Sequence, residues 1–192
     1  MRRSILARSI VNCGIIVCVV GASAARAGAP IEHRVIAVTG DVAPGADGAS
    51  FLAFTTSLNH TIMSPRTDGA GNVLFEAFLD IPGVAENGAR VGVWVDRLGS
   101  LELLAMSGDE APGVPGGVMF AGVPSEYLPF PPLFAGGATA LQGTLLEASP
   151  PGGRTGVWSE ASGSLSLIAL QGEPAPGAPA GFTFGSVAGS IN

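Results

Sequence analysis

The strongest constraint on the fold is an internal repeat. Residues 92–113 begin with Gly-Val-Trp and end with Ala-Pro-Gly, and residues 156–177 have the same two ends. The second half of this pattern also appears earlier, in residues 35–45. Trp94 and Trp158 are 64 residues apart, and Asp109 and Glu173 have the same spacing. Self-similarity at a fixed period indicates one supersecondary unit per period.

The composition indicates an all-β protein. The chain has 29 glycines and 15 prolines among 192 residues, and short apolar runs lie between Gly/Pro-rich segments. This pattern is typical of sandwiches, barrels and propellers. We expect loops at 57–67, 81–89 and 124–132, and about four strands per period. The expected strands are 51–56, 73–79, 91–95 and 101–106, then 118–123, 139–146, 156–160 and 165–170.

Four-stranded antiparallel units in tandem predict propeller blades or the coils of a β-solenoid. Residues 34–45 match the end of a period, yet they precede the first unit. Such an orphan strand favours a propeller, in which it would complete the last blade. We therefore expect a partial β-propeller of residues 28–192, with the orphan strand and turn at 34–45, units at 46–113 and 114–177, and the start of a third at 178–192. Two blades are fewer than the four to eight of a closed propeller.

Residues 1–27 have the features of a signal peptide. Arg2, Arg3 and Arg8 precede an apolar stretch at 10–24, and Ala25-Arg26-Ala27 fits a small-x-small cleavage site. A membrane anchor is the alternative, but the stretch is shorter than the roughly 20 apolar residues of a span. The sequence therefore predicts export to the periplasm, cell surface or medium, by a Sec or a twin-arginine route, with no membrane span after cleavage.

Removal of residues 1–27 would change both the thiol content and the charge. Cys13 and Cys18, the two cysteines, lie in this segment, so residues 28–192 have no disulfide and no thiol nucleophile. Those residues contain five arginines, no lysine and fifteen acidic residues. Such a charge repels nucleic acid and anionic lipid, and we expect neither as a partner.

Three short motifs resemble those of a known protein family. Residues 68–75 read Asp-Gly-Ala-Gly-Asn-Val-Leu-Phe, and the Gly-Val-Trp strands and the Gly-Asp-x-Ala-Pro-Gly turn follow in fixed order. They resemble bacterial exported tandem-repeat proteins with an Asn-x-x-Gly-x-x-Ala-Phe motif and a variable C-terminal anchor. Asp68 and Leu74 depart from that motif, as does most of residues 134–141. The resemblance implies a propeller-like fold without an assigned activity. Because residues 191–192 stand where a third motif would begin, it also implies a fragment.

The positions that recur have structural interpretations. The recurring turn acids Asp41, Asp109 and Glu173 could each give Ca²⁺ one carboxylate, but one acid per period is sparse for a site of six or more oxygens. We expect them to cap backbone N–H groups. Trp94 and Trp158 could stack on sugars, but we expect them to pack inside the sheets. The positions assigned to the repeat are Gly71, Phe75, Trp94, Gly108, Asp109, Pro112, Gly113, Gly137, Trp158, Gly172, Glu173, Pro176 and Gly177.

Catalytic motifs are weak in this sequence. A Ser57/His60/Asp68 triad lacks the Gly-x-Ser-x-Gly elbow that usually presents the nucleophile. His33 and His60 could share a metal ion, but no further pair of ligands is visible. Neither a Walker loop nor a dinucleotide-binding glycine pattern occurs. We therefore expect no metal and no cofactor.

The sequence favours a non-enzymatic, exported repeat protein that acts as a scaffold or binds a protein or glycan through its loops. The apolar residues Leu128, Phe130, Leu133 and Phe134 would form a contact patch in one loop or a surface for a missing blade. A second hypothesis is a hydrolase or lyase with Asp68, Glu76 and Glu102 lining a channel, although Phe134, Gln142 and Ser166 stand at the matching places. A decayed remnant without a role is the third.

Overall fold

A computed structural model describes residues 15–20, 32–53, 65–82, 90–121, 133–147 and 152–185. In these residues every regular element is a β-strand, and all pairings between strands are antiparallel. The all-β fold class is therefore confirmed. No helix in the described part of the chain is long and apolar enough to cross a membrane.

The first sheet follows the order of the chain. Its strands are arranged β3-β5-β6-β7, and the short β4 pairs with β5 outside this path. The longest runs of paired residues join β5 to β6 and β6 to β7. A two-residue turn at Leu98 and Gly99 connects β6 to β7. The strands of this sheet are β3 (Ser50–Ala53), β4 (Arg66–Thr67), β5 (Val73–Asp80), β6 (Arg90–Arg97) and β7 (Ser100–Met106).

The second sheet has the same organisation. Its strands are arranged β8-β10-β11-β12, and the short β9 pairs with β10. Trp158 pairs with Leu141 and Leu167 across this sheet, as Trp94 pairs with Phe75 and Leu103 across the first. The strands are β8 (Met119–Phe120), β9 (Leu133–Ala135), β10 (Ala138–Leu146), β11 (Thr155–Ser159) and β12 (Ser166–Leu170).

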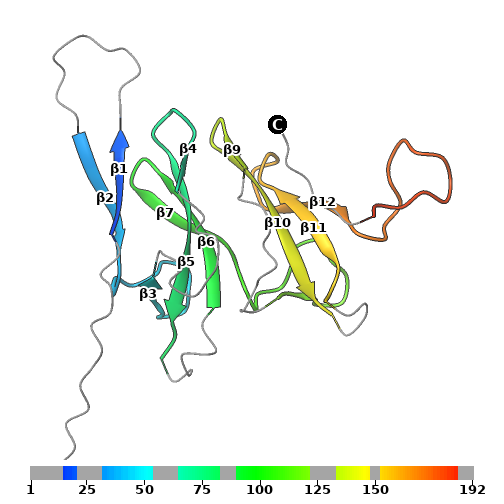
Figure 1. Ribbon diagram of the computed structural model, residues 1–192, viewed down its shortest axis with the longest axis horizontal. Helices are drawn as coiled ribbons and strands as arrows, with labels where there is room; N and C mark the ends of the chain where they lie inside the picture. The colour runs from blue at the N-terminus through cyan, green and yellow to red at the C-terminus, as the bar shows by residue number, and fades with distance from the viewer. Residues whose placement is uncertain are drawn as a thin grey trace, which may run out of the picture.

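A two-stranded sheet precedes them, formed by β1 (Ile15–Val20) and β2 (Glu32–Val38). Val38 and Met106 both stand two residues before the Gly-Asp of the turn, so β2 corresponds to β7. The β1–β2 register also matches β6–β7. Val38 pairs with Ile15 as Met106 pairs with Gly92, and both pairings shift register one residue later. Figure 1 shows β1–β2, the first sheet and the second sheet side by side in chain order.

Burial follows the alternation of the strands. We call the face of each sheet that carries its tryptophan the Trp face, and the other the opposite face. On the Trp face of β5, Val73, Phe75, Ala77 and Leu79 are buried with Trp94. Every residue from 91 to 96 in β6 is buried, so the first sheet is covered on both faces. Sheets buried on both faces are expected in stacked layers.

Neighbouring segments supply this cover. The turn after β2 places Ala43, Ala46 and Ala49 in the core on the Trp face of the first sheet, with Ile36 and Ala37 of β2 beside them. The turn after β7 does the same for the second sheet, where Ala111 and Val114 pack around Trp158. Ala105, on the opposite face of β7, packs against this second core. The two cores therefore follow one another along the stack.

Several strand boundaries differ from the expected ones. Residues 66–67 form β4 rather than loop, and 133–135 form β9 although Leu133 and Phe134 were expected in a loop. Both segments gain strand geometry by pairing with the start of a long strand, which sequence periodicity does not reveal. Of the expected strand at 118–123, Met119–Phe120 form β8, Val118 and Ala121 are coil, and residues 122–123 lie outside the described part of the chain. The strand at 34–39 does not stand alone, because β1 pairs with it.

Candidate functional site

The two tryptophans have matching surroundings. The indole Nε1 of Trp94 donates to the carbonyl of Pro44 at 3.0 Å, and that of Trp158 donates to the carbonyl of Pro112 at 2.8 Å. Both side chains are fully buried. Each tryptophan is therefore fixed to the preceding turn by a hydrogen bond that satisfies the only polar atom of its side chain.

The glycine two residues before each tryptophan leaves room for the ring. A Cβ at Gly92 would lie 2.3 Å from the ring of Trp94, and one at Gly156 would lie 2.7 Å from that of Trp158. One phenylalanine from the first strand of each sheet meets the ring edge-on. Phe51 and Trp94 have centroids 5.0 Å apart, and Phe120 and Trp158 have centroids 4.9 Å apart. The Gly-Val-Trp motif is thus explained by packing.

The turn that contains Ala-Pro-Gly occurs three times with the same backbone hydrogen bonds. The N–H of Gly40, Gly108 and Gly172 donates to the carbonyl of a phenylalanine eleven or twelve residues later, at 2.8–2.9 Å. In return, the phenylalanine N–H donates to the carbonyl of the acidic residue that follows each glycine, at 2.9 Å. The phenylalanines are Phe51, Phe120 and Phe184. We call these turn 1 (40–51), turn 2 (108–120) and turn 3 (172–184).

The three turn acids Asp41, Asp109 and Glu173 make different contacts. The carboxylate of Asp41 accepts from the N–H of Val38 at 3.1 Å, and Glu173 pairs with Arg154 at 3.4 Å. Burial raises the pKa of Asp109, and nearby Arg90 partly offsets this. Among the described residues no three His, Cys, Asp or Glu side chains are grouped as metal ligands would be.

The remaining positions of the motif lie in turns and in the first core. Gly71 (φ 94°) and Gly137 (φ 79°) adopt left-handed conformations in the turns before β5 and β10. Phe75 stacks on Trp94, with centroids 6.1 Å apart. Asp68 accepts from the N–H of Ala70 and Asn72, and the side chain of Asn72 is the main cause that lowers its pKa. Asp68 therefore acts as the cap of its own turn.

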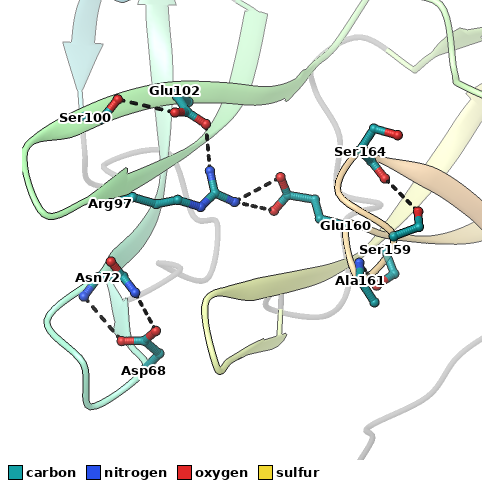
Figure 2. A network of polar contacts seen from close by, with 10 residues as sticks. Asp68, Asn72, Arg97, Ser100, Glu102, Ser159, Glu160, Ala161 and Ser164 are labelled. Carbon is teal, nitrogen blue, oxygen red and sulfur yellow. Dashed lines mark hydrogen bonds and ion pairs between the residues drawn. The ribbon is translucent and has the colours of Figure 1, made fainter.

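Sequence reasoning missed a pair of arginine–carboxylate contacts between successive units. Arg34 of β2 makes a bidentate contact with the buried Asp96 of β6. Arg97 lies between Glu102, at 2.7 Å, and Glu160, at 2.9 Å (Figure 2). Asp96 and Glu160 both stand two residues after a tryptophan, and each binds an arginine of the preceding unit. The recurring Trp-x-acid pattern was the sequence signal, but its partners are 62 and 63 residues away.

Glu76 is the unusual carboxylate of the first sheet. It pairs with Val93, which pairs with Ala105, so all three lie on the opposite face, toward the second core. Loss of water contact raises the pKa of Glu76 to about 7. No hydrogen bond or ion pair of Glu76 is found among the described residues. A carboxylate with such a pKa can act as a general acid or base when a substrate reaches it.

The other residues of the catalytic hypotheses are held elsewhere. Glu102 is exposed and bound to Arg97 and Ser100, while Asp68 caps its turn. The structure therefore does not bring Asp68, Glu76 and Glu102 into hydrogen-bond contact with one another. Ser57 and His60 of the triad lie outside the described residues, as do 124–132 and most of the two other expected loops. His33 lies in β2.

Comparison with known proteins gives a family without a function. No curated protein and no solved structure matches the chain. Residues 24–145, more than half of the chain, match the model of one family described as a family of unknown function, DUF7453. The matched region spans β2, the whole first sheet, turn 2 and most of β10. On this match, the chain belongs to the DUF7453 family of unknown function.

Proposed function

We propose that this chain is an exported, non-enzymatic repeat protein that acts as a scaffold or binding module. The observation that carries the proposal is that the recurring side chains contact one another. Each tryptophan meets a glycine and a phenylalanine of its own unit and the proline carbonyl of the preceding turn. What the chain preserves between its two sheets is thus mainly a packing arrangement, whereas the candidate catalytic carboxylate Glu76 has Gln142 at the matching position.

We propose a partial β-propeller as the architecture, with each sheet one blade of a tandem repeat. The same strand order in both sheets supports this, and so does the stacking of one core behind the next. Blades of four antiparallel strands that cover one another face to face are the propeller pattern. Partner contacts, with a protein or a glycan, would then lie on the loops that differ between units, chiefly 57–67, 81–89 and 124–132.

Export rests on the features of residues 1–27. β1 lies inside this segment, so signal cleavage would remove the strand that pairs with β2. Protein recovered from the periplasm or the medium of the source bacterium should begin at Gly28. Recovery of a cell-associated chain that retains residues 1–27 would contradict export by cleavage.

The binding function is tested separately on purified protein. Glycan and peptide arrays should give saturable binding that disappears when residues 124–132 are replaced by a Gly/Ser segment of equal length. A matched replacement of the exposed hairpin residue Leu98 by Asn should leave binding unchanged. Binding that survives loss of all three loops would contradict recognition through the loops.

The alternative function is a hydrolase or lyase centred on Glu76, and one observation favours it. A pKa of about 7 is suited to proton transfer at neutral pH. A panel of glycosides and esters distinguishes the two functions. We expect no turnover above that of Glu76→Gln, and turnover that this substitution abolishes would replace the binding proposal with the enzymatic one.

A further inference from the structure

The same contact between a turn and the sheet that follows it occurs twice in the stack. In turn 1, Gly45 lies against Leu103 of the first sheet, where an added Cβ would be 2.9 Å from the leucine Cβ. In turn 2, Gly113 lies against Leu167 of the second sheet, where the same distance would be 3.0 Å. The adjoining prolines, Pro44 and Pro112, accept from the tryptophans. Each turn therefore covers the Trp face of the sheet that follows it.

Turn 3 has the geometry of the first two turns without a sheet against it in the described residues. Its backbone hydrogen bonds match theirs, yet an added Cβ at Gly177 would meet nothing within 4 Å. Phe182 is 62% exposed, whereas Ala49, at the same place in turn 1, is 1% exposed. Ile168 of β12 is 61% exposed, whereas Ile36, at the same place in β2, packs against the first core. An apolar surface is thus left open.

The other end of the stack offers the complementary half. By register, Val35 of β2 stands where Leu103 and Leu167 stand in the two sheets, because each pairs with the residue at the tryptophan position. Leu103 and Leu167 each contact the glycine of a turn, but Val35 is 57% exposed. By this correspondence we call the side of β2 that carries Val35 its Trp face. This side lies open, while Ile36 and Ala37 pack against the first core.

We infer that two copies of this chain associate head to tail, with turn 3 of one copy on the Trp face of β2 of the next. Gly177 would then meet Val35 as Gly45 meets Leu103. The partner is a second copy because both halves of the junction are on the same chain. They cannot meet within one chain, since both sheets separate β2 from turn 3 (Figure 1). The inference concerns the chain that retains residues 1–27, because the register of Val35 comes from its pairing with β1, and it does not depend on a ligand.

The junction between copies should be weaker than those inside the chain. In β1 the residue at the tryptophan position is Val17, which has no side-chain N–H for the carbonyl of Pro176. The association is heterologous, because different surfaces meet. Such contacts form a closed ring when the rotation per copy closes and an open filament when it does not.

The experiment measures the mass of the full chain by analytical ultracentrifugation over a range of concentrations. Wild type should increase to at least twice the mass of one chain. Val35→Glu and Phe182→Glu each place a charge in the apolar junction and should weaken association at least about tenfold. Val42→Glu is the matched control. Val42 stays 71% exposed in a covered turn, and Glu110 occupies the same place in turn 2.

An equimolar mixture of the two variants gives the decisive result. Each variant retains the half that the other has lost, so the mixture should form a dimer of one copy of each, although neither variant associates alone. Far-ultraviolet circular dichroism and tryptophan fluorescence report whether each variant is folded. Wild type that stays monomeric at all concentrations would overturn the inference. So would folded variants that fail to form the mixed dimer, because a symmetric dimer would behave in that way.

Discussion

The first and second sheets solve the same packing problem with different side chains. Trp94 is enclosed by two aromatic rings, Phe51 and Phe75, whereas Trp158 has only Phe120 and the aliphatic Leu141 in these places. The glycine and the proline carbonyl are the same in both sheets. The comparison shows that the space for the indole ring and its hydrogen bond are the fixed requirements, and that the rest of the surroundings can vary.

The sheets also differ at positions without a matching interaction. Two residues before the one that pairs with the tryptophan, the first sheet has Val73 and the second has Thr139, both buried. The hydroxyl of Thr139 has no hydrogen-bond partner among the described residues. On the opposite face, Glu76 of the first sheet corresponds to Gln142 of the second. The buried carboxyl of Glu76 in the first sheet and the buried hydroxyl of Thr139 in the second therefore each lower the free energy of unfolding, and the other sheet lacks that group at the matching position.

The largest expected effect comes from removing the two rings. Trp94→Ala should lower the free energy of unfolding by about 4–5 kcal/mol and Trp158→Ala by about 3, because truncation leaves a cavity and the first ring has more aromatic contacts. Urea denaturation followed by circular dichroism measures both. Equal losses would mean that the second phenylalanine adds nothing to the first sheet.

The second-largest effect should come from the two arginine contacts between units, and their losses of stability should differ. Arg34→Met leaves the carboxylate of Asp96, which is 2% exposed, with the Gly99 N–H but without its cationic partner, and should cost about 3 kcal/mol. Arg97→Met should cost less, about 1–2 kcal/mol, because the side chain of Glu160 is 12% exposed against 3% for Asp96, and Glu102 is exposed to solvent. The same denaturation assay applies, and a larger loss for Arg97→Met would reverse this order.

Glu76 should make stability depend on pH. Its pKa is raised from 4.5 to about 7, so the folded state holds the proton more tightly than the unfolded chain does. The stability contributed by this proton is full below pH 4.5 and is lost as the pH rises through 7. Glu76→Gln should therefore be more stable than wild type above pH 7, by up to about 3 kcal/mol, and similar below pH 4.5.

The second sheet provides the matched control for this prediction. Gln142→Glu should introduce a smaller loss of stability with rising pH, because residue 142 has the register of Glu76 but no further sheet covers this face in the described residues. Thermal denaturation at a series of pH values follows both variants. A pH profile for Glu76→Gln that is identical to that of wild type would show that Glu76 is well solvated.

The smallest expected effect is at Thr139. Thr139→Val removes a buried hydroxyl that has no partner and should stabilise the protein by about 1 kcal/mol. Val73→Thr makes the reverse change in the first sheet and should destabilise it by about 1–2 kcal/mol. Denaturation midpoints of the two variants test the pair, and destabilisation by both would indicate a partner for the Thr139 hydroxyl.

Local patterns were sufficient to predict much of the fold. The apolar runs at 73–79 and 91–95 predicted β5 and β6, and the recurring turn residues predicted where β7 and β12 end. The short strands β4 and β9 were missed, since two or three residues carry no periodicity of their own. Residues 15–20 were assigned to a leader, and only the β2 edge reveals that they can also pair as a strand.

The sequence alone determined that the same sheet would be built twice, because a glycine and a tryptophan recur two residues apart in one strand of each unit, and a proline recurs in the turn that precedes each unit. The tertiary structure decided which charges meet between units and which surfaces stay open. Asp96 binds Arg34, Glu160 binds Arg97, and Val35 and Phe182 lie exposed at opposite ends of the stack. These features depend on how one sheet stacks on the next, and residues more than 60 positions apart leave no periodic signal of that contact.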